Sequence, residues 1–258
     1  MNIAVVTLSP EGAILAKVLE AKLPDCAVYV HENVQGHSAS ARFRSIMELT
    51  ASIFHQCSGI VYIVPCGVAV RAVAPHLERK TSDPAVVVVD VRGRWAVSLL
   101  SGHERGANDL ALAVSNILSA EPVITTTTEA LKTLIVGIGC RRGTRSEKIV
   151  AAVKQTLADA GLNLSDVRLL SSAEIKADEQ GLLDAARDLG IPLRFVSSEE
   201  IRNCVFDFEQ SEFVSQQVDL PAVAEPSALL AGRRTTLVVK KKTYNGVTCA
   251  VARESSLS

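Results

Sequence analysis

Apolar runs alternate with amphipathic stretches along most of the chain. The runs at 59–64 and 85–90 are apolar throughout, which is typical of strands covered on both faces of a parallel sheet. At 107–118 apolar residues recur every three or four positions, which is typical of a helix packed on a sheet. This alternation predicts an α/β fold. We expect strands at 2–8, 27–30, 59–64, 85–90, 95–100, 123–124, 133–139, 167–170, 193–196, 237–240 and 247–252, and helices at 13–23, 45–54, 68–76, 107–118, 146–161, 180–189 and 222–231.

The pattern restarts after residues 129–132, which predicts two α/β domains, residues 1–130 and 131–258. The first is expected to hold a mostly parallel sheet. The second is expected to hold a smaller mixed sheet that ends in an antiparallel hairpin, because the turn signal 244–246 separates two short apolar runs. Ser146 is the expected N-cap of the first helix in the second domain.

Composition narrows the class of protein. The chain has 258 residues, a hydrophobic fraction of 48% and a formal net charge of -1. The near-neutral charge and an aromatic fraction of only 4% argue against nucleic-acid binding and against a membrane surface. The six cysteines show no zinc-binding spacing, so we expect reduced thiols in a cytoplasmic protein. We expect neither a signal sequence nor a membrane span, because these residues show no charged start followed by an apolar core and no apolar run long enough to cross a bilayer.

A polar, glycine-containing turn follows the apolar run 95–100. In an open parallel sheet, ligands bind beyond the carboxyl ends of the strands, at such turns. Gly102 and Gly106 would let a ligand approach the backbone, and His103 is the one side chain there that exchanges a proton near neutral pH. An ordinary turn with a solvated histidine is the alternative. The turn consists of Ser101, Gly102, His103, Glu104, Arg105 and Gly106, followed by Asn108 at the start of the helix.

A second glycine-containing loop follows the strand expected at 133–139. The spacing of Gly137, Gly139 and Gly143 is one residue longer than the dinucleotide fingerprint. A nucleotide-binding oxidoreductase is therefore a weak alternative, and an anion-binding loop fits better. Arg141 and Arg142 support an anion, although a solvated surface pair would look the same in the sequence.

Several longer motifs together resemble the CbiG family of anaerobic cobalamin biosynthesis, and the second half also resembles CobE. The motifs are GVAVR at 67–71, DPAVVVVD at 83–90, LLSGHERGAN at 99–108, VGIGCRRGT at 136–144, VAEPSALL at 223–230 and TCAVAR at 248–253. Arg105 stands where the family usually has glycine. The middle segment that many relatives carry is reduced here to residues 129–132.

The resemblance implies a cobalt-precorrin-5A hydrolase, which opens a δ-lactone, releases acetaldehyde and forms cobalt-precorrin-5B. The substrate is a tetrapyrrole that carries its own cobalt, so the resemblance implies neither a cofactor nor a protein metal site. A homodimer and contacts with neighbouring cobalamin-pathway enzymes stay open. The alternative function is a non-catalytic carrier of corrinoid intermediates, which the CobE-like half permits.

This chemistry needs a base that takes a proton from water, hydrogen-bond donors that stabilise the oxyanion, and cations that bind the macrocycle's carboxylates. His103 is the candidate base, and Asp83 could orient it, with an Asp-Pro turn as the alternative. Backbone N–H groups of residues 102–108, or those at Gly67, are the candidate oxyanion donors. The expected substrate-binding residues are Gly67, Arg71, Lys80, Ser101, Gly102, Gly106, Asn108, Gly139, Arg141, Arg142 and Thr144. We expect Gly67, Lys80, His103 and Arg141 to face one cleft.

Overall fold

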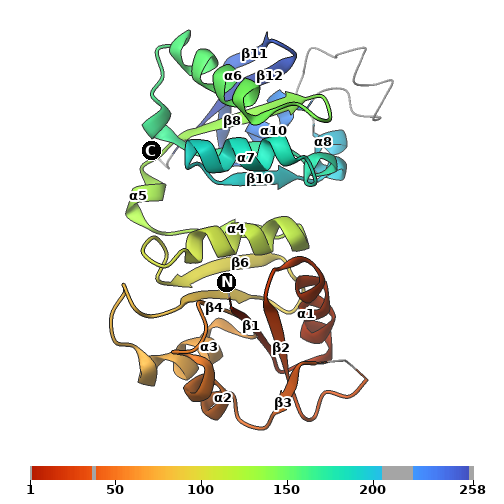
Figure 1. The fold of residues 1–258 in the computed structure, drawn as a ribbon, viewed down its shortest axis with the longest axis vertical. Helices are drawn as coiled ribbons and strands as arrows, with labels where there is room; N and C mark the ends of the chain where they lie inside the picture. The colour runs from red at the N-terminus through yellow and green to blue at the C-terminus, as the bar shows by residue number, and fades with distance from the viewer. Residues whose placement is uncertain (1, 37–38, 205–222, 256–258) are drawn as a thin grey trace. The chain divides into compact units, whose positions relative to one another are not determined.

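A computed structural model describes residues 2–36, 39–204 and 223–255 (Figure 1). The chain divides into two compact units, Met1–Thr126 and Thr127–Ser258. Each unit has its own sheet and its own apolar core. The α/β class expected from the apolar periodicity is confirmed.

The first unit is built on a seven-stranded sheet in the order β3-β2-β1-β4-β5-β6-β7. Neighbouring strands are parallel except β5 and β6, which are antiparallel, so the expected mostly parallel sheet is confirmed. The strands are β1 (Ile3–Thr7), β2 (Cys26–His31), β3 (Ala41–Phe43), β4 (Gly59–Ile63), β5 (Ala85–Val89), β6 (Trp95–Leu100) and β7 (Glu121–Val123).

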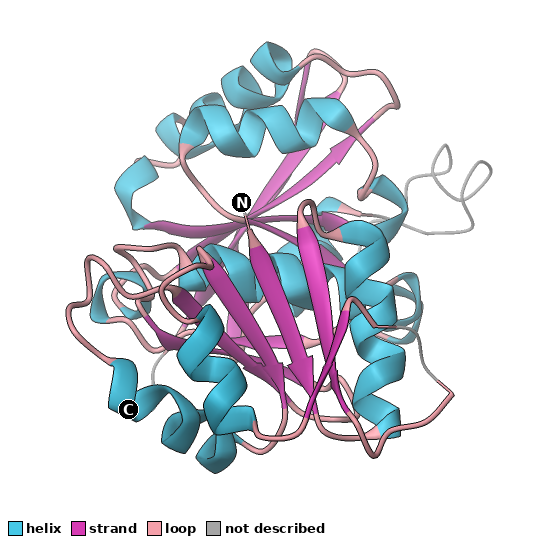
Figure 2. Ribbon diagram, turned by 60° about the horizontal axis from the view of Figure 1, so that its bottom comes forward, coloured by secondary structure: helices cyan, strands magenta, loops and turns pink. Residues whose placement is uncertain are grey.

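Helices cover both faces of this sheet, as Figure 2 shows. On one face, α1 (Pro10–Lys22) and α4 (Ala107–Leu118) pack together and bury their apolar sides on the strands. On the other face lie α2 (Ile46–Ile53), α3 (Cys66–Val73) and the short 3-10 helix η1 (Ala74–His76). The sheet therefore has an apolar layer on each side, as its fully apolar strands require.

The direction of β6 decides where the His103 turn lies. Only residues 90–94 join β5 to β6, whereas a parallel connection needs a crossover of about a dozen residues or more. The Asp90 carboxylate closes this short turn by accepting the N–H groups of Arg94 (2.7 Å) and Trp95 (3.0 Å). As a result β6 runs backwards, and Leu100 lies beside Val86, near the start of β5.

Two opposite edges of this sheet follow from the strand directions. We call the edge where β1, β4 and β5 begin the amino edge, and the edge where they end the carboxyl edge. The His103 turn, residues 101–106, follows β6 and lies at the amino edge. The sequence-based expectation that it lies beyond the carboxyl ends of parallel strands is wrong, because β6 is antiparallel to β5.

The second unit has a five-stranded mixed sheet in the order β10-β9-β8-β12-β11. β8, β9 and β10 are parallel, and β12 is antiparallel to both β8 and β11. Asn245 and Gly246 join β11 to β12 with positive φ of 50° and 83°, so the expected hairpin is confirmed. The strands are β8 (Leu134–Cys140), β9 (Val167–Ala173), β10 (Leu193–Val196), β11 (Thr235–Tyr244) and β12 (Val247–Glu254).

The helices of the second unit include two that pack together, α6 (Ser146–Ala158) and α7 (Gln180–Leu189). α10 (Ala224–Leu230) lies so close to β8 that a Cβ on Gly137 would come 1.8 Å from the carbonyl oxygen of Ala224. Gly137 thus serves helix packing. The remaining elements are α5 (Thr127–Ala130), η2 (Leu164–Asp166), η3 (Glu174–Lys176) and α8 (Ser198–Asn203).

Some local expectations need correction. Ser146 is the first residue of α6 and not its cap; the N-cap is Arg145, and no side chain caps the helix. α6 also ends at Ala158, three residues before the expected end. Strand β3 and helix α8 were not expected, although Ser197 and Glu200 form a capping box at the start of α8. The expected helix at 222–231 is α10, and residue 222 lies outside the described residues.

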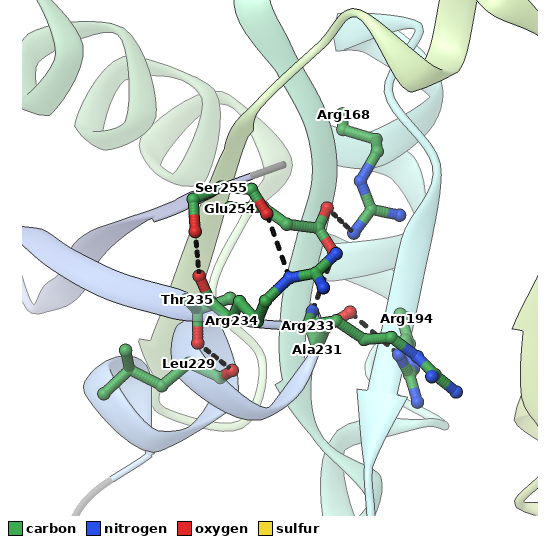
Figure 3. A network of polar contacts seen from close by, with 9 residues as sticks. All are labelled: Arg168, Arg194, Leu229, Ala231, Arg233, Arg234, Thr235, Glu254 and Ser255. Atoms are coloured by element: carbon green, nitrogen blue, oxygen red, sulfur yellow. Dashed lines mark hydrogen bonds and ion pairs between the residues drawn. The ribbon is translucent and has the colours of Figure 1, made fainter. Parts of the chain in front are cut away.

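A polar network closes the end of the second sheet where β8 and β9 begin (Figure 3). The Glu254 carboxylate, at the end of β12, pairs with Arg168 at 2.8 Å and accepts the Arg233 N–H at 2.7 Å. Arg194 of β10 is buried and donates to the carbonyl of Ala231, just after α10, at 2.8 Å. These contacts attach α10 and the β11–β12 hairpin to the parallel strands.

Candidate functional site

The His103 turn is held by its own backbone. The carbonyl of Ser101 accepts the N–H of Ala107 at 3.2 Å, and the carbonyl of Gly102 accepts the N–H of Asn108 at 3.0 Å. These N–H groups at the start of α4 are therefore already bonded. The expectation that the backbone of this segment offers an oxyanion site is wrong for these two groups, because the turn uses them to close on itself.

Asn108 binds neighbouring side chains with both ends of its amide. Its Oδ1 accepts from the Ser98 hydroxyl at 2.8 Å, and its Nδ2 donates to the Thr126 hydroxyl at 3.0 Å. Asn108 is 6% exposed, and a Cβ on Gly102 would come 2.7 Å from the Thr126 methyl. Asn108 and Gly102 thus shape the turn, and an exposed substrate-binding role for Asn108 does not fit this burial.

His103 is exposed beside an ion pair. The ammonium of Lys80 lies 2.7 Å from the carboxylate of Glu104, the next residue after His103. The hydrogen bond from Lys80 lowers the pKa of Glu104 below its usual value, and the nearby charge of His103 adds a smaller effect in the same direction. The same hydrogen bond raises the pKa of Lys80. Lys80 and His103, expected in one site, are thus brought to the same edge of the sheet.

Asp83 lies in the loop that carries Lys80. It is 3% exposed, and its carboxylate accepts the backbone N–H groups of Glu78 and Arg79 at 3.2 Å. These contacts match the turn-forming alternative, in which the carboxylate shapes the loop. Asp83 therefore shapes the loop that carries Lys80, and no contact in the described part of the chain joins it to His103.

Ser101 combines a strained backbone with an unpaired hydroxyl. Its φ of 59° lies in the left-handed region, which residues other than glycine and asparagine rarely adopt. Ser101 is buried, and its Oγ has no hydrogen-bond partner among the described residues. Strain and an unsatisfied polar group both cost stability, and such features concentrate at functional sites. Gly106, also at positive φ, ends the same turn.

Gly67 and Arg71 lie elsewhere in the first unit. Gly67 belongs to the first turn of α3, directly after the carboxyl edge, and its carbonyl accepts from the Arg71 guanidinium at 3.4 Å. The five residues of β5 separate the two edges by roughly 15 Å at 3.3 Å per residue. Gly67 and His103 therefore do not face one cleft, because they follow strands of opposite direction.

The expected anion loop of the second unit follows β8. Gly143 adopts a φ of 74°, and its N–H donates to the buried carboxylate of Glu179 at 2.8 Å. The Thr144 hydroxyl donates to the carbonyl of Arg141 at 2.7 Å. The N–H group of Gly143 is thus already hydrogen-bonded to the Glu179 carboxylate.

Arg142 and Gly139 also have structural roles. The Arg142 guanidinium pairs with Asp178 at 2.9 Å and donates to the carbonyl of Ile175 at 3.2 Å. This pair raises the pKa of Arg142 and lowers that of Asp178. Gly139 lies inside β8, opposite Thr248, and not in the loop. A ligand at Arg142 would therefore compete with Asp178 for the guanidinium.

Sequence reasoning missed Glu104, Thr126 and Glu179 as partners of the candidate residues. Their contacts join positions 18 to 36 residues apart, and no local pattern reports such pairs. One signal was available: five residues between two apolar runs, Gly93 among them, favour a hairpin and so predict the antiparallel β6.

A metal cluster and a membrane-spanning helix are both absent from the described residues. No group of three or more His, Cys, Asp or Glu side chains in the described ranges is placed to hold a metal ion. No helix in the part of the chain that the structure describes is long and apolar enough to cross a membrane.

Comparison with known proteins identifies the family. The model described as "Cobalamin synthesis G N-terminal" matches residues 48–129, and that described as "Cobalamin synthesis G C-terminus" matches residues 134–252. The chain belongs to the cobalamin synthesis G family. The two matches follow each other in order and cover most of both units, which confirms the resemblance to CbiG seen in the motifs.

Two curated relatives of this cobalamin synthesis G protein match most of the chain, and a third matches about half of it. It is 26% identical over 357 aligned positions to "Cobalt-precorrin-5A hydrolase" of Priestia megaterium, covering 96% of this chain and 94% of the relative. It is 25% identical to the protein of that name from Salmonella typhimurium, covering 89% of this chain and 91% of the relative. "Protein CobE" of a Sinorhizobium species is 34% identical over 51% of this chain and 86% of that relative.

Proposed function

We propose that this chain is a cobalt-precorrin-5A hydrolase. The observation that carries the proposal is the match along both units to relatives of that name, over more than nine-tenths of their length. The family models support it, because both family domains are present in the family's order. The reaction is the hydrolysis of the substrate's δ-lactone with release of a two-carbon unit as acetaldehyde.

The reaction needs a base that takes a proton from water as its oxygen adds to the lactone carbonyl. His103 is the residue that we assign to this role. It is exposed, so water and a large substrate can reach it, and it lies on a turn closed by Ala107 and Asn108. A base must be held near its target, and the backbone contacts of the turn supply that constraint.

The macrocycle's carboxylates need cationic partners, and Lys80 is the candidate next to His103. Glu104 already pairs with Lys80, so a substrate carboxylate competes with Glu104 for this ammonium. Arg142 in the second unit is likewise paired with a protein carboxylate, that of Asp178, with which a substrate carboxylate would compete. Both pairs are exposed and solvent-screened, so exchanging one carboxylate for another changes little else. Arg71 and Arg141 remain candidates for further carboxylates.

The metal in this reaction is part of the substrate. Cobalt enters and leaves with the tetrapyrrole, so the proposal assigns the protein no metal site and no cofactor. The proposed partner is therefore the anionic tetrapyrrole itself, and the protein's contribution is binding and proton transfer.

A carrier of corrinoid intermediates is the second candidate. It is favoured by the likeness of half of the chain to CobE, at 34% identity. A carrier would bind the pigment and leave its lactone intact. Turnover therefore separates the two functions, whereas binding does not.

The test is to incubate the purified protein with cobalt-precorrin-5A and measure acetaldehyde with a coupled alcohol dehydrogenase. We expect acetaldehyde in proportion to the substrate consumed, over many turnovers per protein molecule. Pigment binding without acetaldehyde would support the carrier and reject the hydrolase.

A further inference from the structure

A hollow of about 330 Å³ lies in the first unit at the carboxyl edge, the edge opposite the His103 turn. Its apolar wall includes Val64 after β4, Val97 of β6 and Val123 of β7, together with the indole of Trp95. Trp95 is 40% exposed although it begins a strand, and Val97 and Val123 are half-buried. The volume lies at the lower end of the range of small-molecule sites.

The polar groups of the hollow favour an anion. The guanidinium of Arg92 lines it and forms no ion pair with any described residue. Pro65 and Cys66 also line it. Pro65 is the N-cap of α3 and Cys66 its first residue, and no side chain caps this N-terminus. The N–H groups of the first helical positions lack acceptors within a helix, and with the helix dipole they favour negative charge.

The carboxylate in the hollow does not cancel this preference, because Asp90 is used by its own turn. Its oxygens accept N–H groups from Arg92, Arg94 and Trp95, and the Arg94 Nε at 2.9 Å. Burial works to raise the pKa of Asp90, but these hydrogen bonds outweigh it and lower the pKa. Asp90 is therefore an ionised carboxylate that holds the backbone of Arg92 and Trp95 at the rim of the hollow.

We propose that the hollow over Trp95 is a second binding site, for an aromatic or pyrrole ring that carries carboxylate arms. The ring lies against the indole and the valine wall, and a carboxylate reaches Arg92 and the start of α3. The identity of the ligand rests on the proposed function, because the edge of a tetrapyrrole presents pyrrole rings with carboxylate arms. The site lies across the sheet from His103, so it docks the pigment without contacting the base.

The test uses the chain's single tryptophan, Trp95, as a local probe. The probe ligand is 1,3-phenylenediacetate, an aromatic ring with two acetate arms that does not absorb at the emission wavelength of tryptophan. We expect a saturable change in Trp95 emission, and protection of the Cys66 thiol from N-ethylmaleimide in peptide mapping. The dimethyl ester, which has the same ring and no charge, should bind at least tenfold more weakly, since charge-assisted hydrogen bonds are lost.

Two variants that each remove one positive charge complete the test. Arg92→Gln should weaken the probe about tenfold or more, while Lys17→Gln, on the exposed side of α1, should leave its affinity unchanged. An unsaturable emission change, equal weakening in both variants, or equal binding of the ester would overturn the site. The acetaldehyde assay is read separately: turnover without probe binding rejects the hollow alone, and probe binding without turnover rejects the hydrolase alone.

Discussion

Lys80 and Glu104 form an ion pair of 2.7 Å that joins the loop before β5 to the His103 turn after β6. Lys80 was expected to bind a carboxylate, and the carboxylate that it binds in this structure comes from the protein itself. The side chain of Lys80 is 76% exposed and that of Glu104 31%. Glu104 is therefore a competitor of a substrate carboxylate for Lys80.

This competition predicts opposite effects for the two partners of one ion pair. Lys80→Gln removes the cation and should raise KM for cobalt-precorrin-5A by about tenfold, the effect of a lost charged hydrogen bond. Glu104→Gln removes the competitor and should lower KM. Steady-state acetaldehyde release measures both, and the difference should shrink at high salt because the attraction is screened. If both substitutions raise KM equally, the pair is a structural link and Lys80 is not a substrate ligand.

The assignment of His103 as base predicts a loss of rate without a loss of fold. His103→Ala should slow acetaldehyde release by about 10²–10⁴-fold, the usual range for a lost general base, while its urea unfolding curve stays that of the wild type because the side chain is exposed. His103→Gln keeps a hydrogen-bonding group and cannot take a proton, so it should be nearly as slow. Near-wild-type turnover by the Gln variant would show that His103 only shapes the turn.

Two glycines predicted to bind substrate should respond differently to alanine. At Gly102 a Cβ would come 2.7 Å from the Thr126 methyl and 2.9 Å from the Asn108 oxygen, so Gly102→Ala should cost about 1–3 kcal/mol of unfolding free energy. At Gly67 the nearest atom to an added Cβ is a guanidinium nitrogen of Arg71 at 3.5 Å. Gly67→Ala should therefore raise the free energy of unfolding by about 0.5 kcal/mol, because alanine favours a helix over glycine. Urea titrations check both values. A stable but inactive Gly67→Ala would show that a ligand approaches this backbone.

Ser101 should show a conflict between stability and activity. Ser101→Gly relieves the left-handed backbone at φ 59° and removes an unpaired buried hydroxyl, so it should stabilise the fold by about 1 kcal/mol. Ser101→Ala removes the hydroxyl and keeps the strain, which makes it the matched control. Lower kcat in both variants would assign the hydroxyl to the reaction. Unchanged kcat in Ser101→Gly would show that the strained backbone of Ser101 does not contribute to catalysis.

Two buried weak acids predict a loss of stability in alkali. Burial raises the pKa of Tyr62 from 10.0 to about 12 and that of Cys249 from 9.0 to about 12. The folded state thus holds these protons more tightly than the unfolded state, so their stabilising contribution is complete below about pH 9 and is lost as the pH rises towards 12. Urea unfolding at pH 7.5 and 10.5 measures the loss. Tyr62→Phe, which cannot ionise, should lose less stability over this interval than the wild type.

The sequence by itself determined the elements that depend on neighbouring residues. Helix 180–189 and strand 193–196 have the bounds expected from their apolar spacing, and Gly190 ends the helix in the left-handed conformation that glycine adopts readily. Asn245 and Gly246 form the expected hairpin turn. Helix periodicity, caps and tight turns act over a few residues, so the local chain carries the information.

The tertiary structure alone decided which side chains meet. An apolar run has the same pattern in either direction, so the run 95–100 taken alone does not say at which edge His103 lies. The short connection from β5 favours a reversal, and the pairing of β6 with β5 decides it. The partners of Lys80, Asn108 and Arg142 were likewise settled by packing. A polar side chain binds whichever group the folded chain brings within about 3 Å, and strand order and direction, which are set by long-range burial, determine which group that is.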